Sequence, residues 1–595
     1  MQTYLIFFKN RFVNILHKDI IFGSFSLFNN YIFASELKTK KMKILKLIIL
    51  AIILNGCGLY NMSSNYHKVN YEQTPSVLQT KGEMISINLK GTFPEKYFAK
   101  KATVEITPVI IGEDGKESKL KSIILQGEQA TGGDETIFFE SGGSFVYSDK
   151  IKYTDDMKSS LLELRAIAVL EDENKVLGPV TIAKGVISTS MKVANNEIIA
   201  IAHHGYEEET ILSETATIYF LVNKSNIRTT EKSDADVKKL QEFIKLGYKT
   251  ESFVVKSSAS PEGKEKINTE LSDDRQNNTF AYAKSLLKKL KADGANNDDN
   301  YKKSSAGADW DGFNKLVENS SIDEKNTILN LTDKTKQRSQ KERGELLQDM
   351  AQVYDALEKD VLQFLRKSEI TINSYQPKKT KSEILSLSLE NPSKLTIEEL
   401  LYSATLEENE KNKLVIYNIA IELHNDWRAY NNLAAYYLSN NDAKTAVELL
   451  NLAYENGGSE DPSVLTNLGI VASWNGSLSN AQDLFDRAKT HSTNQGILDI
   501  RQGNYGSAVK LLKTNSYNAA LANILNGVYN ITCNENTAEC YYLNAIAGAR
   551  SSNESLLFTN LEKAVNLSSS YKLEALNDLE FEDYKSNEQF LSIIK

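Results

Sequence analysis

Hydrophobic and polar positions change their period along the 595-residue chain, and these changes divide it into regions. Residues 81–215 alternate with a period of two, as in Ile85-Ser86-Ile87 and Leu162-Glu163-Leu164, and this spacing is typical of half-buried strands. Turn signals such as Glu113-Asp114-Gly115 separate the runs. Short strands at this spacing predict an N-terminal β-sandwich.

The second region, residues 216–378, mixes strand and helix periods. It opens with an expected strand at 217–222, and a helix follows at about 237–244. A buried strand at 252–255 then precedes a turn and a second helix at about 280–290. This order of elements predicts an α/β unit.

A long insertion, about residues 291–360, separates the second helix from the expected closing strand. It begins with a polar stretch from Asp293 to Lys303 and continues with amphipathic helices, among them 322–331 and 344–365. We interpret Trp310, in an earlier helix of the insertion, as a core residue rather than a ligand platform.

The third region, residues 395–595, is helical and repetitive, and residues 379–394 are expected to be a linker. Large and small apolar residues return after 35 positions with the same internal spacing. The matching positions are Leu433, Ala434, Tyr437, Ala446, Leu468, Gly469, Ala481 and Ala488. Weaker copies include Leu400, Gly496 and Ala545. The whole chain is therefore expected to be a multidomain α+β protein that ends in an α-solenoid.

The N-terminus has the layout of a secretory signal peptide. Two lysines follow Met42, an apolar run spans residues 47–54, and small residues then lead to Cys57. The run is too short to cross a bilayer, which needs about 20 apolar residues. Met42 is thus the natural start, and residues 1–56 are interpreted as an upstream extension and a signal peptide.

Composition excludes several classes of function. A formal net charge of -9 argues against a nucleic-acid binder, which needs a basic face. Three cysteines and six histidines without metal-ligand spacing give no metal site, and His203-His204 is interpreted as structural because strand neighbours point to opposite sides. No nucleophile elbow, HExxH motif or phosphate loop occurs. We therefore expect a protein that is not an enzyme and that needs no cofactor.

Two remaining cysteines, Cys533 and Cys540, are seven residues apart. In an exported protein they either pair and staple a turn between helices or remain two buried free thiols. The sequence leaves both alternatives open.

The sequence Leu54-Asn55-Gly56-Cys57 resembles the bacterial lipobox. The resemblance implies that Cys57 is acylated and becomes the new N-terminus, with residues 57–80 as a polar tether. It also implies an outer-membrane protein that is held by lipid and faces the periplasm. The alternative is an ordinary signal peptide with a chance cysteine.

Residues Asn268 to Arg275 resemble the Asn-x-x-Leu-Ser-x-x-Arg signature of OmpA-like domains, which are periplasmic and commonly bind peptidoglycan. The resemblance implies that Arg275 and an aspartate grip the stem peptide of peptidoglycan. Here Ser260 stands in the place of that aspartate, and Glu262 is a substitute two residues on. Arg275 is therefore either a ligand contact or part of a structural salt bridge. The insertion, at Ala308 to Phe313, resembles a group of Bacteroidetes envelope proteins.

The 35-residue period resembles the tetratricopeptide repeat (TPR). In this family small residues let paired helices approach closely, and the first helices line a concave groove for extended peptides. Tyr437 and Trp474 fall on first helices, and for Tyr437 we favour packing between repeats.

Two functions fit these resemblances. The first is a non-catalytic lipoprotein scaffold that links the outer membrane to peptidoglycan and holds a protein partner in its repeats. The second is an assembly or recruiting factor of an outer-membrane or secretion complex, in which the OmpA-like domain is only structural. Binding to peptidoglycan distinguishes the two.

Overall fold

We describe the fold from a computed structural model, which places residues 58–262, 264–333, 335, 338–512 and 515–595. The predicted signal peptide and Cys57 lie outside the described residues. One compact unit comprises residues 58–201, 434–454 and 458–595, and a second comprises residues 202–433 and 455–457. Each unit is described by itself.

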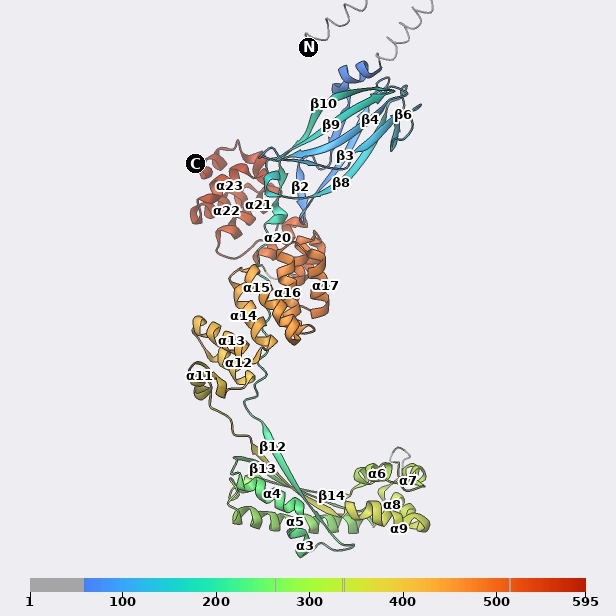
Figure 1. The fold of residues 1–595 in the computed structure, drawn as a ribbon, viewed down its shortest axis with the longest axis vertical. Helices are drawn as coiled ribbons and strands as arrows, with labels where there is room; N and C mark the ends of the chain where they lie inside the picture. Colours follow the sequence, from blue (N-terminus) through green and yellow to red (C-terminus); the bar gives the residue numbers. More distant parts are fainter. Residues whose placement is uncertain (1–57, 263, 334, 336–337, 513–514) are drawn as a thin grey trace, which may run out of the picture. The chain divides into compact units, whose positions relative to one another are not determined.

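The first unit begins with a domain of eleven strands (Figure 1). The strands are β1 (Asn70–Gln73), β2 (Leu78–Lys81), β3 (Met84–Phe93), β4 (Thr103–Ile111), β5 (Glu117–Lys119), β6 (Ile123–Gly127), β7 (Glu135–Ile137), β8 (Gly143–Lys152), β9 (Leu161–Leu170), β10 (Glu173–Lys184) and β11 (Val186–Ile187). One sheet has the order β1-β3-β2-β11 with β8 on β3, and the other has the order β10-β9-β4-β6-β7 with β5 on β4. The alternating apolar residues of both sheets share one core, so the predicted N-terminal sheet region is confirmed.

The limits of this domain differ from the predicted ones. Residues 58–64 are helical, and Leu59 and Met62 are buried in the sheet core, so the tether predicted for 57–80 is wrong over the described residues. These apolar side chains are spaced three apart, which matches one face of a helix turn. At the other end the last strand ends at Ile187, well before residue 215.

The second unit contains a mixed four-stranded sheet (Figure 1). Its elements are β12 (Ile211–Tyr219), α3 (Thr229–Lys232), α4 (Ala235–Lys245), β13 (Thr250–Ala259), α5 (Glu265–Lys289), β14 (Tyr301–Ala308) and β15 (Lys367–Tyr375). The strand order is β12-β15-β13-β14, in which only β13 and β14 run parallel. Apolar residues of α4 and α5 pack with those of β12, β13 and β15 in one core.

Strand β14 was not expected from the sequence: it begins at the end of the polar stretch Asp293 to Lys303 and continues to Ala308. The stretch lacks apolar alternation since most of its side chains are exposed or half-buried, while its backbone pairs with β13. The inserted helices are α6 (Trp310–Glu318), α7 (Lys325–Thr332), α8 (Gln340–Asp349), α9 (Ala351–Leu357), the π-helical turn η6 (Glu358–Leu362) and α10 (Gln363–Leu365). Trp310 is 6% exposed in their core, as expected. The helix expected at 344–365 is interrupted at Met350.

Helices fill the rest of the chain. They are α11 (Lys381–Glu390), α12 (Ile397–Leu406), α13 (Glu410–His424), α14 (Trp427–Ser439), α15 (Ala443–Ala453), α16 (Pro462–Trp474), α17 (Leu478–Ala488), α18 (Ser492–Arg501), α19 (Tyr505–Leu511), α20 (Tyr517–Leu525), α21 (Ala538–Arg550), α22 (Glu554–Leu567), α23 (Ser570–Asn577) and α24 (Glu588–Ile594). The predicted helical C-terminal region is therefore confirmed. The expected linker 379–394 is wrong, because Thr380 and Glu383 form a capping box that starts α11. No helix among the described residues is long and apolar enough to cross a bilayer.

The small residues of the repeat pattern lie where helices touch. Ala434, Ala446, Ala481 and Ala488 are buried in one core, and Leu468 and Tyr437 pack against it. At Gly469 any side chain would meet the ring of Phe485 on the paired helix. Leu433, in the second unit, is also buried. Tyr437 thus contributes to packing, as favoured above.

Close helix contact predicts the effect of one substitution. A methyl group on Gly548 in α21 would overlap the backbone nitrogen of Leu557 in α22, and backbone cannot move aside as a side chain can. We expect Gly548→Ala to destabilise the repeats by about 1–3 kcal/mol, as other overpacked sites do. Urea unfolding followed by circular dichroism measures this.

The matched control is Gly506→Ala in α19, where the nearest atom to an added methyl is 3.7 Å away. Alanine favours a helix over glycine by about 1 kcal/mol, so this variant should be neutral or stabilising. Equal destabilisation of both variants would contradict the packing described for Gly548.

Candidate functional site

Three asparagines of the first unit hold an extended stretch of the same chain. They are Asn467 in α16, Asn494 in α18 and Asn518 in α20, each on the first helix of a pair or at its equivalent position. All three side chains are buried. Their partners are backbone groups of residues 194–200, which belong to no helix or strand.

Each asparagine makes the same two hydrogen bonds. The backbone nitrogen of Ala200 donates to Oδ1 of Asn467 over 2.9 Å, and Nδ2 of Asn467 donates to the carbonyl of Ala200 over 2.7 Å. Asn494 pairs in this way with Ile198 at 2.7 and 2.9 Å. Asn518 pairs with Ala194 at 3.0 and 2.9 Å. A side-chain amide has one acceptor and two donors, so it satisfies a residue's backbone as a neighbouring strand would.

The second unit contains the same contact at Ala202. Asn432 in α14 accepts from the backbone nitrogen of Ala202 over 2.7 Å and donates to its carbonyl over 3.0 Å. We call the three asparagines of the first unit, Asn467, Asn494 and Asn518, the asparagine ladder. Sequence analysis missed these contacts, although Asn432 and Asn467 immediately precede the aligned Leu433 and Leu468.

Side chains of the held segment add to these backbone contacts in the first unit. The Nε1 of Trp474 donates to Glu197 over 3.0 Å, and Arg501 forms an ion pair with the same carboxylate at 3.7 Å. Burial raises the pKa of Glu197 and lowers the pKa of Arg501, so removal from water outweighs their mutual attraction. Ile199 packs against the core of the repeats. Trp474 thus contacts the held segment and also packs against the core of the repeats.

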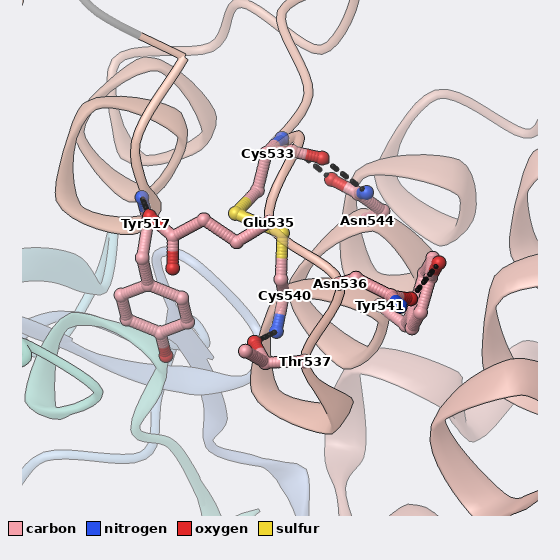
Figure 2. The surroundings of a disulfide bond; sticks show 8 residues. All are labelled: Tyr517, Cys533, Glu535, Asn536, Thr537, Cys540, Tyr541 and Asn544. Atoms are coloured by element: carbon pink, nitrogen blue, oxygen red, sulfur yellow. Dashed lines mark hydrogen bonds between the residues drawn. A yellow bond between two sulfur atoms is a disulfide. The ribbon is translucent and has the colours of Figure 1, made fainter. Parts of the chain in front are cut away.

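The cysteines extend the same pattern to α21. Cys533 and Cys540 form a disulfide with Cα atoms 5.5 Å apart, which decides between the two alternatives left by the sequence (Figure 2). Asn544 exchanges two hydrogen bonds of 2.9 Å with the backbone of Cys533. Thr537 caps α21 by accepting from the backbone nitrogen of Cys540. The loop before α21 is therefore held as the 194–200 segment is.

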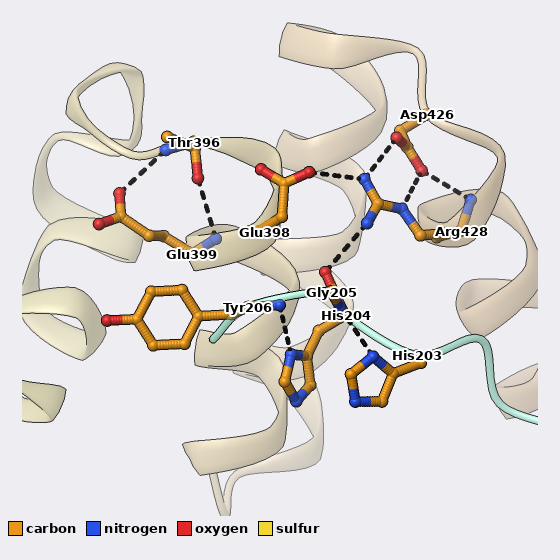
Figure 3. A network of polar contacts seen from close by, with 9 residues as sticks. All are labelled: His203, His204, Gly205, Tyr206, Thr396, Glu398, Glu399, Asp426 and Arg428. Carbon is orange, nitrogen blue, oxygen red and sulfur yellow. Dashed lines mark hydrogen bonds and ion pairs between the residues drawn. The ribbon is translucent and has the colours of Figure 1, made fainter. Parts of the chain in front are cut away.

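The neighbouring histidines follow Ala202 in the second unit, and their rings lie on the same side of the segment (Figure 3). The ring centroids are 4.3 Å apart and the ring planes are tilted by 30°, so the side chains do not point to opposite sides, as they would in a strand. The reason is that the segment turns here: Nδ1 of His203 accepts from Gly205, and Nδ1 of His204 accepts from Tyr206. Gly205 has a φ of 75°, which few other residues adopt.

Arg428 fixes this turn. It donates to the carbonyl of His204 over 3.0 Å and is paired with Asp426 and Glu398 (Figure 3). Burial lowers the pKa of His204. Within the described residues no group of three or more histidine, cysteine, aspartate or glutamate side chains is arranged to hold a metal ion.

The second predicted site surrounds Arg275, whose guanidinium is fully buried at 0% exposure. It donates to the carbonyls of Lys224 and Ser258, both over 3.0 Å, and to that of Leu221 over 3.4 Å. The same group lies 5.1 Å above the ring of Phe220. Burial, with a smaller effect of a neighbouring arginine, lowers the pKa of Arg275 to about 10. The guanidinium group of Arg275 thus has hydrogen-bond partners inside the domain and is not exposed to a ligand.

That neighbouring arginine is Arg366, which contacts two other candidate residues, Ser260 and Glu262. Its Nε donates to the hydroxyl of Ser260 over 3.1 Å, and its other nitrogens pair with Glu358 and, at 3.5 Å, with Glu262. Ser260 also donates to Glu262 over 2.7 Å. The predicted substitute carboxylate, Glu262, therefore lies nearest to Arg366 and not to Arg275. Sequence analysis named neither Arg366 nor Glu358 as a site residue.

Asn268 is buried at the start of α5, one face of which also carries Arg275. The structure thus brings Ser260, Glu262 and Arg275 into one buried cluster, with Arg366 between them. Arg366 pairs there with two glutamates and Arg275 donates to backbone carbonyls, so both guanidinium groups have partners within their own domain.

Comparison with known proteins gives weak similarity only. No family model matches the sequence, and no curated protein matches it. Among solved structures, a tetratricopeptide repeat protein from Parabacteroides merdae ATCC 43184 is 15% identical over 33% of this chain and 91% of that chain, with a TM-score of 0.26. The APC/C hetero-tetramer Cut9-Hcn1 is 13% identical over 62% of this chain and 61% of that chain, with a TM-score of 0.22. Scores this low do not establish a shared fold.

The contacts of Arg275 predict a structural role. Arg275→Ala removes the donor to three backbone carbonyls, and each buried acceptor left without a partner costs about 1–3 kcal/mol. We expect faster amide hydrogen exchange across β12, β13 and α5. Lys266→Ala, on an exposed part of α5, is the matched control and should change nothing. Unchanged exchange in Arg275→Ala would contradict the structural role.

Proposed function

We propose that this protein is a non-catalytic scaffold of the cell envelope that binds other polypeptides through its helical repeats. The observation that carries the proposal is the asparagine ladder, because it already holds an extended stretch of polypeptide by its backbone. The repeat pattern that resembles TPR supports the same function. The absence of a catalytic motif from the sequence supports a scaffold over an enzyme.

The place of this scaffold in the cell follows from the resemblance at Cys57. An acylated Cys57 would anchor the chain in the outer membrane with its domains in the periplasm. The formal net charge of -9 gives no attraction to anionic headgroups, so the lipid would be the anchor. A single acyl chain binds membranes only weakly, so this anchor needs more than one.

The sheet domain of residues 211–375 decides between two versions of the scaffold. In the first, its OmpA-like motif holds peptidoglycan and the protein links the outer membrane to the cell wall. In the second, the domain is only structural and the protein recruits or assembles partners. The second version is favoured by the internal use of Arg275 and Arg366, which donate to groups of their own domain.

Sedimentation with purified peptidoglycan sacculi tests which version holds. We expect the wild-type chain to remain in the supernatant, because the guanidinium that would grip a stem peptide is buried. Glu358→Gln removes the charge of one carboxylate that pairs with Arg366, at a half-exposed position. Pelleting of this variant would show that the cluster can bind peptidoglycan weakly. Strong pelleting of the wild type would restore the linking role.

Affinity purification from the native membrane tests the scaffold function itself. We expect a partner protein to co-purify with the wild type and to be lost from the Asn467→Ala, Asn494→Ala double variant. The matched control is Asn480→Ala, an exposed asparagine on the second helix of the same pair. If no protein co-purifies in an amount comparable to that of the wild-type chain, the scaffold function is refuted.

A further inference from the structure

The asparagine ladder recognises a backbone pattern more than a side-chain sequence. Ile198 and Ala200 are two residues apart, and each presents its backbone nitrogen and carbonyl to one asparagine of the first unit. Their alternate spacing is that of a strand, in which every second residue faces the same way. The ladder therefore accepts an extended peptide and excludes proline at the paired positions, since proline has no backbone donor.

The residues that pair with the ladder reach it through their backbone. Ile198 is 46% exposed although its backbone is paired, and Ile201 is 59% exposed. The paired alanines are small. Four other residues of the segment reach the repeats with their side chains: Glu197 contacts Trp474 and Arg501, Ile199 packs against the core, Asn195 accepts from Arg501, and Asn196 accepts from Asn518. A different polypeptide with an extended backbone and small residues at the paired positions would make the same backbone contacts.

We propose that residues 194–200 are an intramolecular ligand of the repeats and that a partner binds by putting an extended segment of its own in their place. This inference rests on the proposed function and names the chemistry of the partner: an extended peptide stretch without proline at the paired positions, in which a carboxylate can take the place of Glu197 beside Trp474 and Arg501. A partner must therefore make more side-chain contacts with the repeats than residues 194–200 do, and weaker competitors are excluded.

Covalent attachment explains why the segment holds its place. A ligand on a short linker acts at an effective concentration in the millimolar range. A free peptide of the same sequence must compete with that concentration and will appear to bind weakly. Releasing the attached segment should therefore raise the affinity for the free peptide without any change in the ladder.

The test uses the purified full chain and a fluorescent peptide of residues 192–206. In the Ile198→Pro, Ala200→Pro double variant two backbone donors to the ladder are lost while the asparagines remain. We expect this variant to bind the peptide at least tenfold more tightly than the wild type in fluorescence anisotropy. Adding Asn467→Ala and Asn494→Ala should abolish that gain.

Ile201→Pro is the matched control, because residue 201 lies between paired positions and its side chain is exposed. It should bind the peptide as weakly as the wild type does. If the double proline variant has the circular dichroism of the wild type and still binds no better, the proposal is overturned.

A second variant keeps the test decisive should the proline variant not fold. Ile199→Ser weakens the packing of the attached segment and leaves every ladder contact in place. Faster amide exchange at Ile198 and Ala200, together with tighter peptide binding, supports the proposal. Faster exchange without tighter binding, or no change in either, overturns it. Neither result depends on a partner from the membrane. Failure to purify a partner and failure of the peptide to replace the attached segment therefore remain distinguishable.

Discussion

The pairing of an asparagine side chain with the backbone of one residue is the interaction on which the rest of the structure depends. Residues 192–206 belong to no helix or strand, so their backbone groups lack the partners that secondary structure supplies. Buried asparagines provide those partners at successive helix pairs. The repeats are thereby ordered around a part of their own chain.

The buried arginines obey the same constraint. Arg275 and Arg366 lose their water on folding, and the chain replaces it with carbonyls, a hydroxyl and two carboxylates. Both regions that resemble ligand-binding families are therefore satisfied from within the molecule. In the repeats the internal partner is a continuous segment that can leave as a unit. Around Arg275 the partners belong to the strands and helices of the domain itself, so a ligand could enter only by breaking them.

Sequence patterns predicted the regions whose side chains are buried on one face. The alternation around Ile85 and the 35-residue period at Leu433 mark a sheet region and a helical region correctly. They failed where backbone contacts decide the structure, as in polar β14 and the helix capped by Thr380. The candidate residues near Arg275 were found, but their internal partners were not. The ladder escaped because Asn467 and Ala200 are 267 positions apart, and no local pattern connects them.

The polar character that concealed β14 has a consequence for the association of this domain. The strand order leaves β14 at an edge of its sheet, where unpaired backbone groups can recruit a strand from another molecule. Lys302 and Lys303 are both exposed on this strand. Pairing the β14 strands of two copies would bring the lysine side chains of both copies together and remove their charges from water. The lysines therefore discourage edge-to-edge aggregation of a protein whose repeats are built to accept extended chain.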